Sequence, residues 1–203
     1  MSTFGSVKTK RGIAGLRDLT PADIPAIIDY WLLSPPEYLD FMGVNRQLLG
    51  SSEDIHKRFL NAVRTGDPTQ SVIALAITLD DLFAGYTLLR RYSEAVNYSH
   101  WHIVISSLRG QGLSTALYPL RIKAYFDMVP IIQLIHQTRT GNLGVNRMLD
   151  KFVMISETKF IDKPDGVAIP GNFHIRFVRR EDIPRFFVRA VELGIDPRIW
   201  PTV

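Results

Sequence analysis

Apolar residues recur along the chain at two different spacings. Between Thr20 and Leu32 they fall on one helical face after a Thr-Pro start, which predicts an amphipathic helix. Residues 51–63, opened by Ser51 or Ser52, predict a second helix, and the Pro- and Gly-rich stretch 34–50 between the two predicts a loop. Residues 12–19 predict a short strand.

The middle and end of the chain change to strand-like runs. Residues 71–79, 83–91 and 98–106, joined by short polar turns, predict an antiparallel meander. A helix follows Gly112, and Pro119 inside it removes one backbone hydrogen bond and predicts a kink. The later elements are predicted as a strand at 130–136, a short helix around 145–152, strands within 153–161 and 172–179, and a helix from Asp182. This order predicts the α+β class, a mixed sheet with helices on its faces.

The 203 residues include no cysteine, which excludes disulfides, cysteine-ligated metals and a thiol nucleophile. His56, His136 and His174 have no metal-ligand spacing, so no metal is expected. The net charge of +4 suits an anionic ligand and equally an ordinary basic protein. The basic stretches 8–11 and 176–185 lack interleaved aromatic residues, so we expect a solvated surface and no nucleic-acid partner.

The N-terminal residues MSTFGSVKTK lack the apolar segment of a signal peptide. No stretch of the sequence reaches the roughly 18 apolar residues of a membrane span. We therefore expect a cytoplasmic protein without a membrane partner. The predicted organisation is a flexible N-terminus (1–11), one main domain (12–180) and a C-terminal helical extension (181–203).

The most informative segment runs from a strand through Arg109-Gly110-Gln111-Gly112-Leu113-Ser114 directly into a helix. The two glycines permit a tight turn, and amides at a helix start form an anion site suited to a pyrophosphate. Arg109 can add a charge-assisted contact. The segment has neither the Gly-Lys-Ser/Thr ending of a P-loop nor the third glycine of a dinucleotide fold.

This loop resembles the acyl-CoA pyrophosphate motif of the GCN5-related N-acetyltransferases (GNAT family), here Arg109-x-x-Gly112-x-Ser114 with serine in place of the final Gly or Ala. Residues 142–152 resemble the second signature of that family, and residues 16–23 resemble its opening strand and helix. The resemblance covers roughly residues 14–160. It implies a mostly antiparallel sheet that splays at the strand before the glycine loop.

The resemblance also implies an acetyl-CoA co-substrate, direct attack of an amine on its thioester, and a homodimer. Backbone groups of Val104 would bond the pantetheine arm, its amide or that of a neighbour would polarise the thioester carbonyl, and Asn142 would contact the arm from the other side. The implied pyrophosphate-binding residues are Arg109, Gly110, Gln111, Gly112, Leu113 and Ser114.

Candidates for proton transfer are less well defined by the sequence. His100 and His102 lie on one face of the strand that enters the loop and are candidate general bases, with Glu94 in the preceding turn as a competitor. Many family members have a tyrosine acid at the position of Leu149, where leucine cannot donate a proton. Tyr118, Ser106 or solvent would then serve as the acid.

The family builds its acceptor site from the first two helices, their connection and the last strands. The candidate wall is Trp31, Glu37, Tyr38, Phe41, Met42 and Arg46. The sequence therefore favours an N-acetyltransferase acting on a primary amine of a small molecule or peptide. A catalytically weak acyl-CoA-binding sensor is the alternative, favoured by Leu149, and the sequence leaves the acceptor and the length of the acyl group open.

Overall fold

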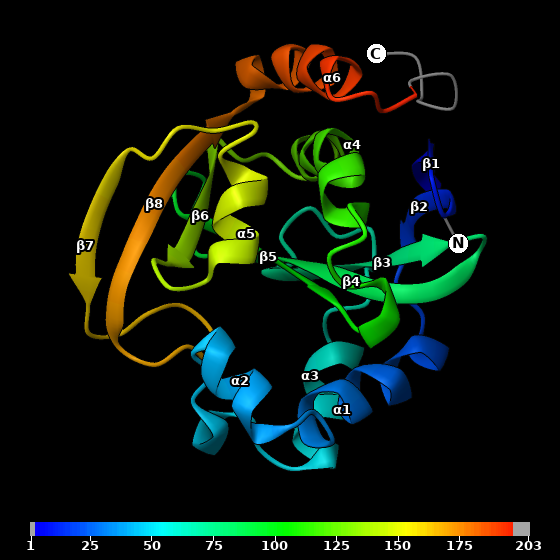
Figure 1. The fold of residues 1–203 in the computed structure, drawn as a ribbon. Coiled ribbons are helices and arrows are strands. Elements are labelled where there is room, and N and C mark those ends of the chain that lie inside the picture. Colours follow the sequence, from blue (N-terminus) through cyan, green and yellow to red (C-terminus); the bar gives the residue numbers. More distant parts are fainter. Residues whose placement is uncertain (1–2, 197–203) are drawn as a thin grey trace.

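The computed structural model describes residues 3–196, which form one mixed eight-stranded sheet with helices on both faces (Figure 1). The strand order is β1-β2-β3-β4-β5-β6-β8-β7, and the single parallel pair in this sheet is β5–β6. The predicted fold class is confirmed. The strands are β1 Thr3–Thr9, β2 Gly12–Asp18, β3 Val72–Leu79, β4 Leu82–Arg91, β5 Asn97–Ile103, β6 Gln133–Arg139, β7 Glu157–Ile161 and β8 Gly171–Arg179.

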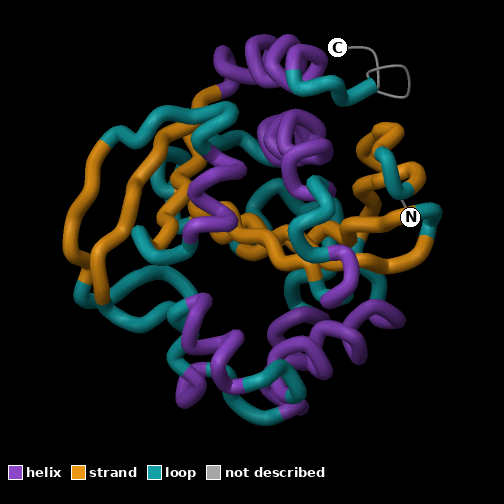
Figure 2. Tube along the Cα trace, in the orientation of Figure 1, coloured by secondary structure: helices purple, strands orange, loops and turns teal. Residues whose placement is uncertain are grey.

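The helices divide between the two faces of the sheet (Figures 1 and 2). Strand β3 shows why, because its side chains alternate: Ile73 and Leu75 pack with the core around α4, whereas Ala74 and Ala76 pack with the core under α1 and α3. Both faces of the sheet are apolar, so helices pack on both and shield them from water. The helices are α1 Ile24–Leu32, α2 Pro36–Met42, α3 Ser52–Leu60, α4 Leu113–Met128, α5 Leu143–Leu149 and α6 Ile183–Glu192.

The structure differs from the prediction at the N-terminus, whereas the strand predicted at residues 12–19 is present as β2. Residues 3–9 form β1, an edge strand paired antiparallel to β2, where the sequence predicted a flexible segment. The segment is mostly polar because one side of an edge strand faces solvent, and Val7 is its fully buried residue. Alternation over so short a segment is too weak to reveal such a strand.

The stretch 34–50, predicted as a loop, contains the helix α2. Pro36 lies at its first position and Gly43, with φ 72°, ends it. The helix is only two turns long, so its start and stop residues make up much of its sequence and resemble a loop.

Strands β5 and β6 separate soon after they meet. Their pairing is limited to Tyr98 and Ile135, although each strand has seven residues. Beyond that pair β6 continues along β8 and leaves a gap beside β5. The splay expected at the strand before the glycine loop is therefore present.

The helices α5 and α6 are anchored by buried contacts. Arg176 of β8, placed by the sequence in a solvated basic stretch, is fully buried and donates to Asn146 Oδ1 (3.0 Å) and Asp150 Oδ1 (2.6 Å) of α5. Phe186 and Ala190 of α6 are fully buried against α4. The predicted C-terminal helix is confirmed up to residue 192, while residues 197–203 of the expected extension lie outside the described residues.

No helix among residues 3–196 has the length and apolar character required to cross a bilayer. Within the same range, no three His, Cys, Asp or Glu side chains gather closely enough to hold a metal ion.

Candidate functional site

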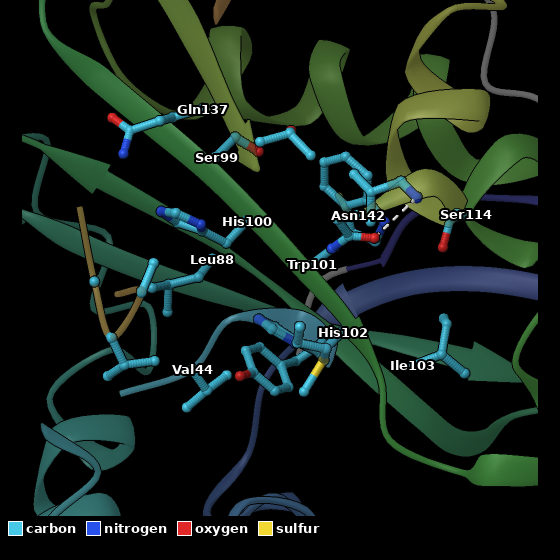
Figure 3. A pocket seen from close by; sticks show the side chains of 18 of the residues that line it. Val44, Leu88, Ser99, His100, Trp101, His102, Ile103, Ser114, Gln137 and Asn142 are labelled. Atoms are coloured by element: carbon cyan, nitrogen blue, oxygen red, sulfur yellow. Dashed lines mark hydrogen bonds between the residues drawn. The ribbon is translucent and has the colours of Figure 1, made fainter. Parts of the chain in front are cut away.

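A cavity of about 940 Å³ opens at the gap between β5 and β6. It continues from the glycine loop at the start of α4, past β5, to the helices α1–α3 on the other face of the sheet. His100 and His102 point from β5 toward the side of Leu88 and Val44, while Ser114 and Asn142 lie across the strand (Figure 3). The cavity thus joins two chemically different halves through the splayed strands.

The glycine loop presents backbone amides to one half of the cavity. Gly110 and Gly112 have φ values of 71° and 86°, a conformation that other residues rarely adopt. The first helical bond of α4 runs from Ala116 N to Gly112 O (2.9 Å). The amides of residues 113–115 come before that bond and have no partner within the helix, so they are available to an anion.

Side chains of the loop behave differently from its backbone. Leu113 is fully buried in the core, and the Gln111 side chain accepts hydrogen bonds from Arg11 outside the cavity. Ser114, Gly110 and Gly112 line the cavity. Binding at this loop would therefore rest on the main chain.

Arg109 does not point its guanidinium toward the helix start. Its Nε donates to Ile103 O (3.1 Å), its Nη2 donates to Val104 O (3.0 Å), and the group stacks 4.1 Å from the Tyr38 ring centre. The side chain lines the cavity while bracing the end of β5. The guanidinium is thus bonded to carbonyls of the chain, and a contact between Arg109 and the pyrophosphate stays a prediction.

The backbone amide of Val104 is not free to donate to a ligand. Its amide donates to Ala84 O (2.9 Å) and its carbonyl accepts from Arg109. Because amides alternate in direction along an antiparallel strand, those of Trp101 and Ile103 point away from β4, toward the gap. Of the two options that the sequence left open, Val104 or a neighbour, the register with β4 favours the neighbour.

Asn142 lies at the start of α5, on the far side of the gap. Its side-chain oxygen caps the helix by accepting from Val145 N (3.3 Å), and the residue lines the cavity as expected. Arg147 and Lys151, which follow on the same segment, add two positive charges to this half of the cavity.

His100 is held by a carboxylate that sequence reasoning missed. Its Nε2 lies 2.6 Å from Asp165 Oδ2, and Tyr92 donates to Asp165 Oδ1 (2.6 Å). Burial raises the pKa of the Asp165 carboxyl, but the hydrogen bonds from His100 and Tyr92 and the charge of Arg90 outweigh burial and leave the pKa below its ordinary value. An ionised Asp165 can only accept, so Nε2 carries the proton and Nδ1 keeps its lone pair.

His102 lies among aromatic rings. Its Nδ1 is 3.0 Å from the Tyr30 hydroxyl, and its ring stacks on Tyr86 and meets the edge of Trp31. Burial, with smaller contributions from His100 and Arg109, lowers the pKa of His102 to about 3. His102 is therefore neutral and a weaker base than an ordinary imidazole.

The other candidates for proton transfer lie outside the cavity. Glu94 is exposed in the turn before β5, and Ser106 is exposed beyond its end. Tyr118 is fully buried, stacked on Phe152 and within 3.1 Å of His136 Nε2. Glu94 as a base, and Tyr118 or Ser106 as an acid, are not supported by these positions.

The aromatic wall of the acceptor half is only partly as predicted. Trp31, Tyr38, Phe41 and Met42 line the cavity, whereas Glu37 and Arg46 do not. Sequence reasoning missed Tyr30 and Tyr86, whose ring and hydroxyl contacts with Trp31 complete the wall.

Comparison with known proteins gives no match among family models and none among curated proteins. Solved structures do match. RimJ from Mycobacterium smegmatis, in complex with a CoA disulfide, is 15% identical with a TM-score of 0.76, covering 99% of this chain and all of that one.

Two further acetyltransferase structures in complex with coenzyme A show the same likeness. The aminoglycoside acetyltransferase AAC(6')-Ib is 18% identical with a TM-score of 0.64, over 85% of this chain and 98% of that one. RimL, the ribosomal L7/L12 alpha-N-protein acetyltransferase, is 13% identical with a TM-score of 0.66, over 86% and 97%. The chain therefore has the GNAT acetyltransferase fold, as its sequence resemblance predicted.

Proposed function

We propose that this protein is an acetyl-CoA-dependent N-acetyltransferase. The observation that carries the proposal is the single cavity that connects the free amides at the start of α4 with an Asp-His pair across the splayed strands. The similar structures RimJ, AAC(6')-Ib and RimL, each in complex with coenzyme A or its disulfide, support the same function.

The residues present suit coenzyme A as a co-substrate. Backbone amides of residues 113–115 would hold its pyrophosphate, assisted by the nearby charges of Arg147 and Lys151. A side chain at Gly110 or Gly112 would project into open space rather than into protein, where a ligand can approach. Amides of Trp101 and Ile103 would face the pantetheine arm, and Asn142 would line its other side.

Coenzyme A supplies an activated acetyl thioester when it is bound. His100 Nδ1 would take a proton from the acceptor ammonium, and Asp165 would stabilise the resulting imidazolium through Nε2–H. The aromatic wall would exclude water and orient the amine, which contributes through proximity. The amine attacks the thioester carbonyl and the CoA thiolate leaves. Leu149 cannot donate a proton, and Tyr118 and Ser106 lie outside the cavity, so the thiolate would take its proton from solvent.

Release of free thiol from acetyl-CoA, measured across a panel of amines, amino acids, peptides and polyamines, tests this function. We expect thiol release that depends on at least one acceptor and falls in His100→Ala. Saturable CoA binding with no release across the panel would instead favour the acyl-CoA-binding sensor. The cytoplasmic location, the homodimer and the domain boundary at residue 180 stay predictions.

A further inference from the structure

The charged side chains of the cavity are unbalanced in sign. Among the described residues that line it, Asp165 is the sole carboxylate, and both of its oxygens accept hydrogen bonds from His100 and Tyr92. The lining cations are Arg58, Arg90, Arg109, Arg139, Arg147 and Lys151. A second amino group on the acceptor would therefore find no uncommitted carboxylate and several like charges.

Four of these six cations are assigned to contacts other than the acceptor. Arg147 and Lys151 lie in the half proposed for the CoA phosphates, and Arg109 is bonded to β5 carbonyls. The Arg139 side chain fills the space between Gly43 and Gly171, where an added methyl group would collide with it or press against it. Arg58 and Arg90 lie in the acceptor half, where Arg58 donates one hydrogen bond to Leu49 O (3.1 Å) and the charge of Arg90 acts on Asp165.

Arg90 is a cross-strand neighbour of the proposed base. It pairs with Tyr98 in the β4–β5 register, and His100 is two residues further along β5 on the same face. Such diagonal neighbours are about 7–8 Å apart. Arg90 and His100 line the same cavity, and the charge of Arg90 contributes to the lowered pKa of Asp165, the carboxyl that holds His100.

Arg58 lines the acceptor half of the cavity from α3. Arg58, Arg90 and Tyr86 line the same cavity. Burial raises the pKa of Tyr86, and the Trp31 hydrogen bond and then the charges of the two arginines oppose that rise. Arg58 Nη2 donates to Leu49 O (3.1 Å). Within residues 3–196 neither guanidinium has a carboxylate at ion-pair distance.

We propose that the acceptor is an amine that also carries a carboxylate, with Arg90 and Arg58 binding the carboxylate while the amine faces His100. The inference rests on the proposed acetyltransfer and names its substrate class. Arginine is suited to this role because its planar guanidinium binds a carboxylate through two parallel hydrogen bonds. A free amino acid and a peptide with an N-terminal Asp or Glu both offer this chemistry.

Matched pairs of acceptors isolate the effect of the acceptor's carboxylate on kcat/KM. Each free amino acid is compared with its amide, which keeps the size and removes the charge, and peptides beginning with Asp or Glu are compared with those beginning with Asn or Gln. We expect kcat/KM to favour the carboxylate by about tenfold or more in one of the two series, and the series that responds identifies the source of the carboxylate.

Two variants test the assignment to these arginines. Arg90→Gln and Arg58→Gln should each raise KM for the carboxylate acceptor about tenfold, with KM for the amide changed less than about twofold. Arg90→Lys should recover part of the loss. Arg46→Gln, an exposed arginine outside the cavity that pairs with Asp40, is the matched control and should change neither KM.

The experiments distinguish a failure of the proposed substrate class from a failure of the proposed acetyltransfer. Equal use of both acceptors, a preference for amides or diamines, or unchanged discrimination in both variants would overturn the inference while leaving acetyltransfer intact. If no acceptor releases thiol, calorimetry measures instead how tightly each amino acid and its amide bind to CoA-loaded protein. Tighter binding of the carboxylate that Arg90→Gln abolishes would support the site, and no difference would refute it.

Discussion

The two halves of the cavity are built in different ways. The half at the glycine loop comes mainly from consecutive residues and presents backbone amides at the start of one helix. The acceptor half is assembled from α1, α2, α3, β4, β5 and the turn at residues 163–166, and it presents side chains. A backbone site can therefore be recognised from a short sequence motif, whereas a side-chain site depends on how distant segments pack.

The two halves of the cavity should also respond differently to mutation. In the glycine loop, at residues 110–114, a side chain can change with little loss of binding, provided the backbone conformation is kept. In the acceptor half each function rests on a particular atom, such as Nδ1 of His100. Substitutions in the two halves can test this contrast.

The largest effect is expected at His100. His100→Ala removes the proposed base and should lower kcat/KM by about 10²–10⁴-fold, with CoA affinity nearly unchanged. Steady-state kinetics together with CoA calorimetry measure both quantities. Full activity in a folded variant would rule out His100 as the base.

Gly112→Val should weaken CoA binding by about tenfold or more, because valine cannot adopt φ 86° without strain and would project toward the phosphates. Gly66→Val is the matched control. Gly66 has φ 87° in open space outside the cavity, so its replacement imposes similar strain without touching the site. Equal CoA affinities in the two folded variants would count against the loop assignment.

Asp165→Asn should reduce kcat/KM by about tenfold and move the acidic limb of its pH profile to lower pH, because the imidazolium loses its ionised partner. Tyr92→Phe keeps the carboxylate and should change kcat/KM less. An Asp165→Asn profile that overlays the native one would show that the pair is structural.

His102→Gln should leave the midpoint of the acidic limb in place. Burial lowers the pKa of His102 to about 3, so this imidazole stays neutral above that pH and does not titrate near neutrality. The pH dependence of kcat/KM between pH 5 and 9 provides the check. Disappearance of the limb would make His102 the base.

The smallest effect is expected at Gln111, although it lies inside the motif. Its side chain faces Arg11 on the surface, so Gln111→Ala should change CoA affinity by less than about twofold. A larger loss, measured by calorimetry, would mean that side chains of the loop take part in binding.

Sequence reasoning succeeded where function follows from local backbone geometry. Gly110, Gly112 and the start of α4 were identified because two glycines before a helix have a direct structural meaning. His100 and His102 were placed on one face by strand alternation. The splay beside β5 came from the family resemblance.

The sequence predictions differ from the structure where strand register or the packing of distant segments sets the position of a residue. The sequence could not decide between the amide of Val104 and that of a neighbour, because the register with β4 is absent from a single strand's sequence. Asp165 occupies a Lys-Pro-Asp-Gly turn whose composition indicates only a turn, yet the turn closes onto His100. Tyr118 is a candidate acid in the sequence because Leu149 leaves the usual tyrosine position vacant, but in the structure Tyr118 is buried in the core.

Calorimetric titration of CoA into the purified protein tests the central claim most directly. The cavity, the free amides of α4 and the GNAT acetyltransferase fold predict saturable binding at a single site per chain. Heats indistinguishable from dilution across the titration would contradict the account, because both the proposed transferase and its sensor alternative require coenzyme A to bind there.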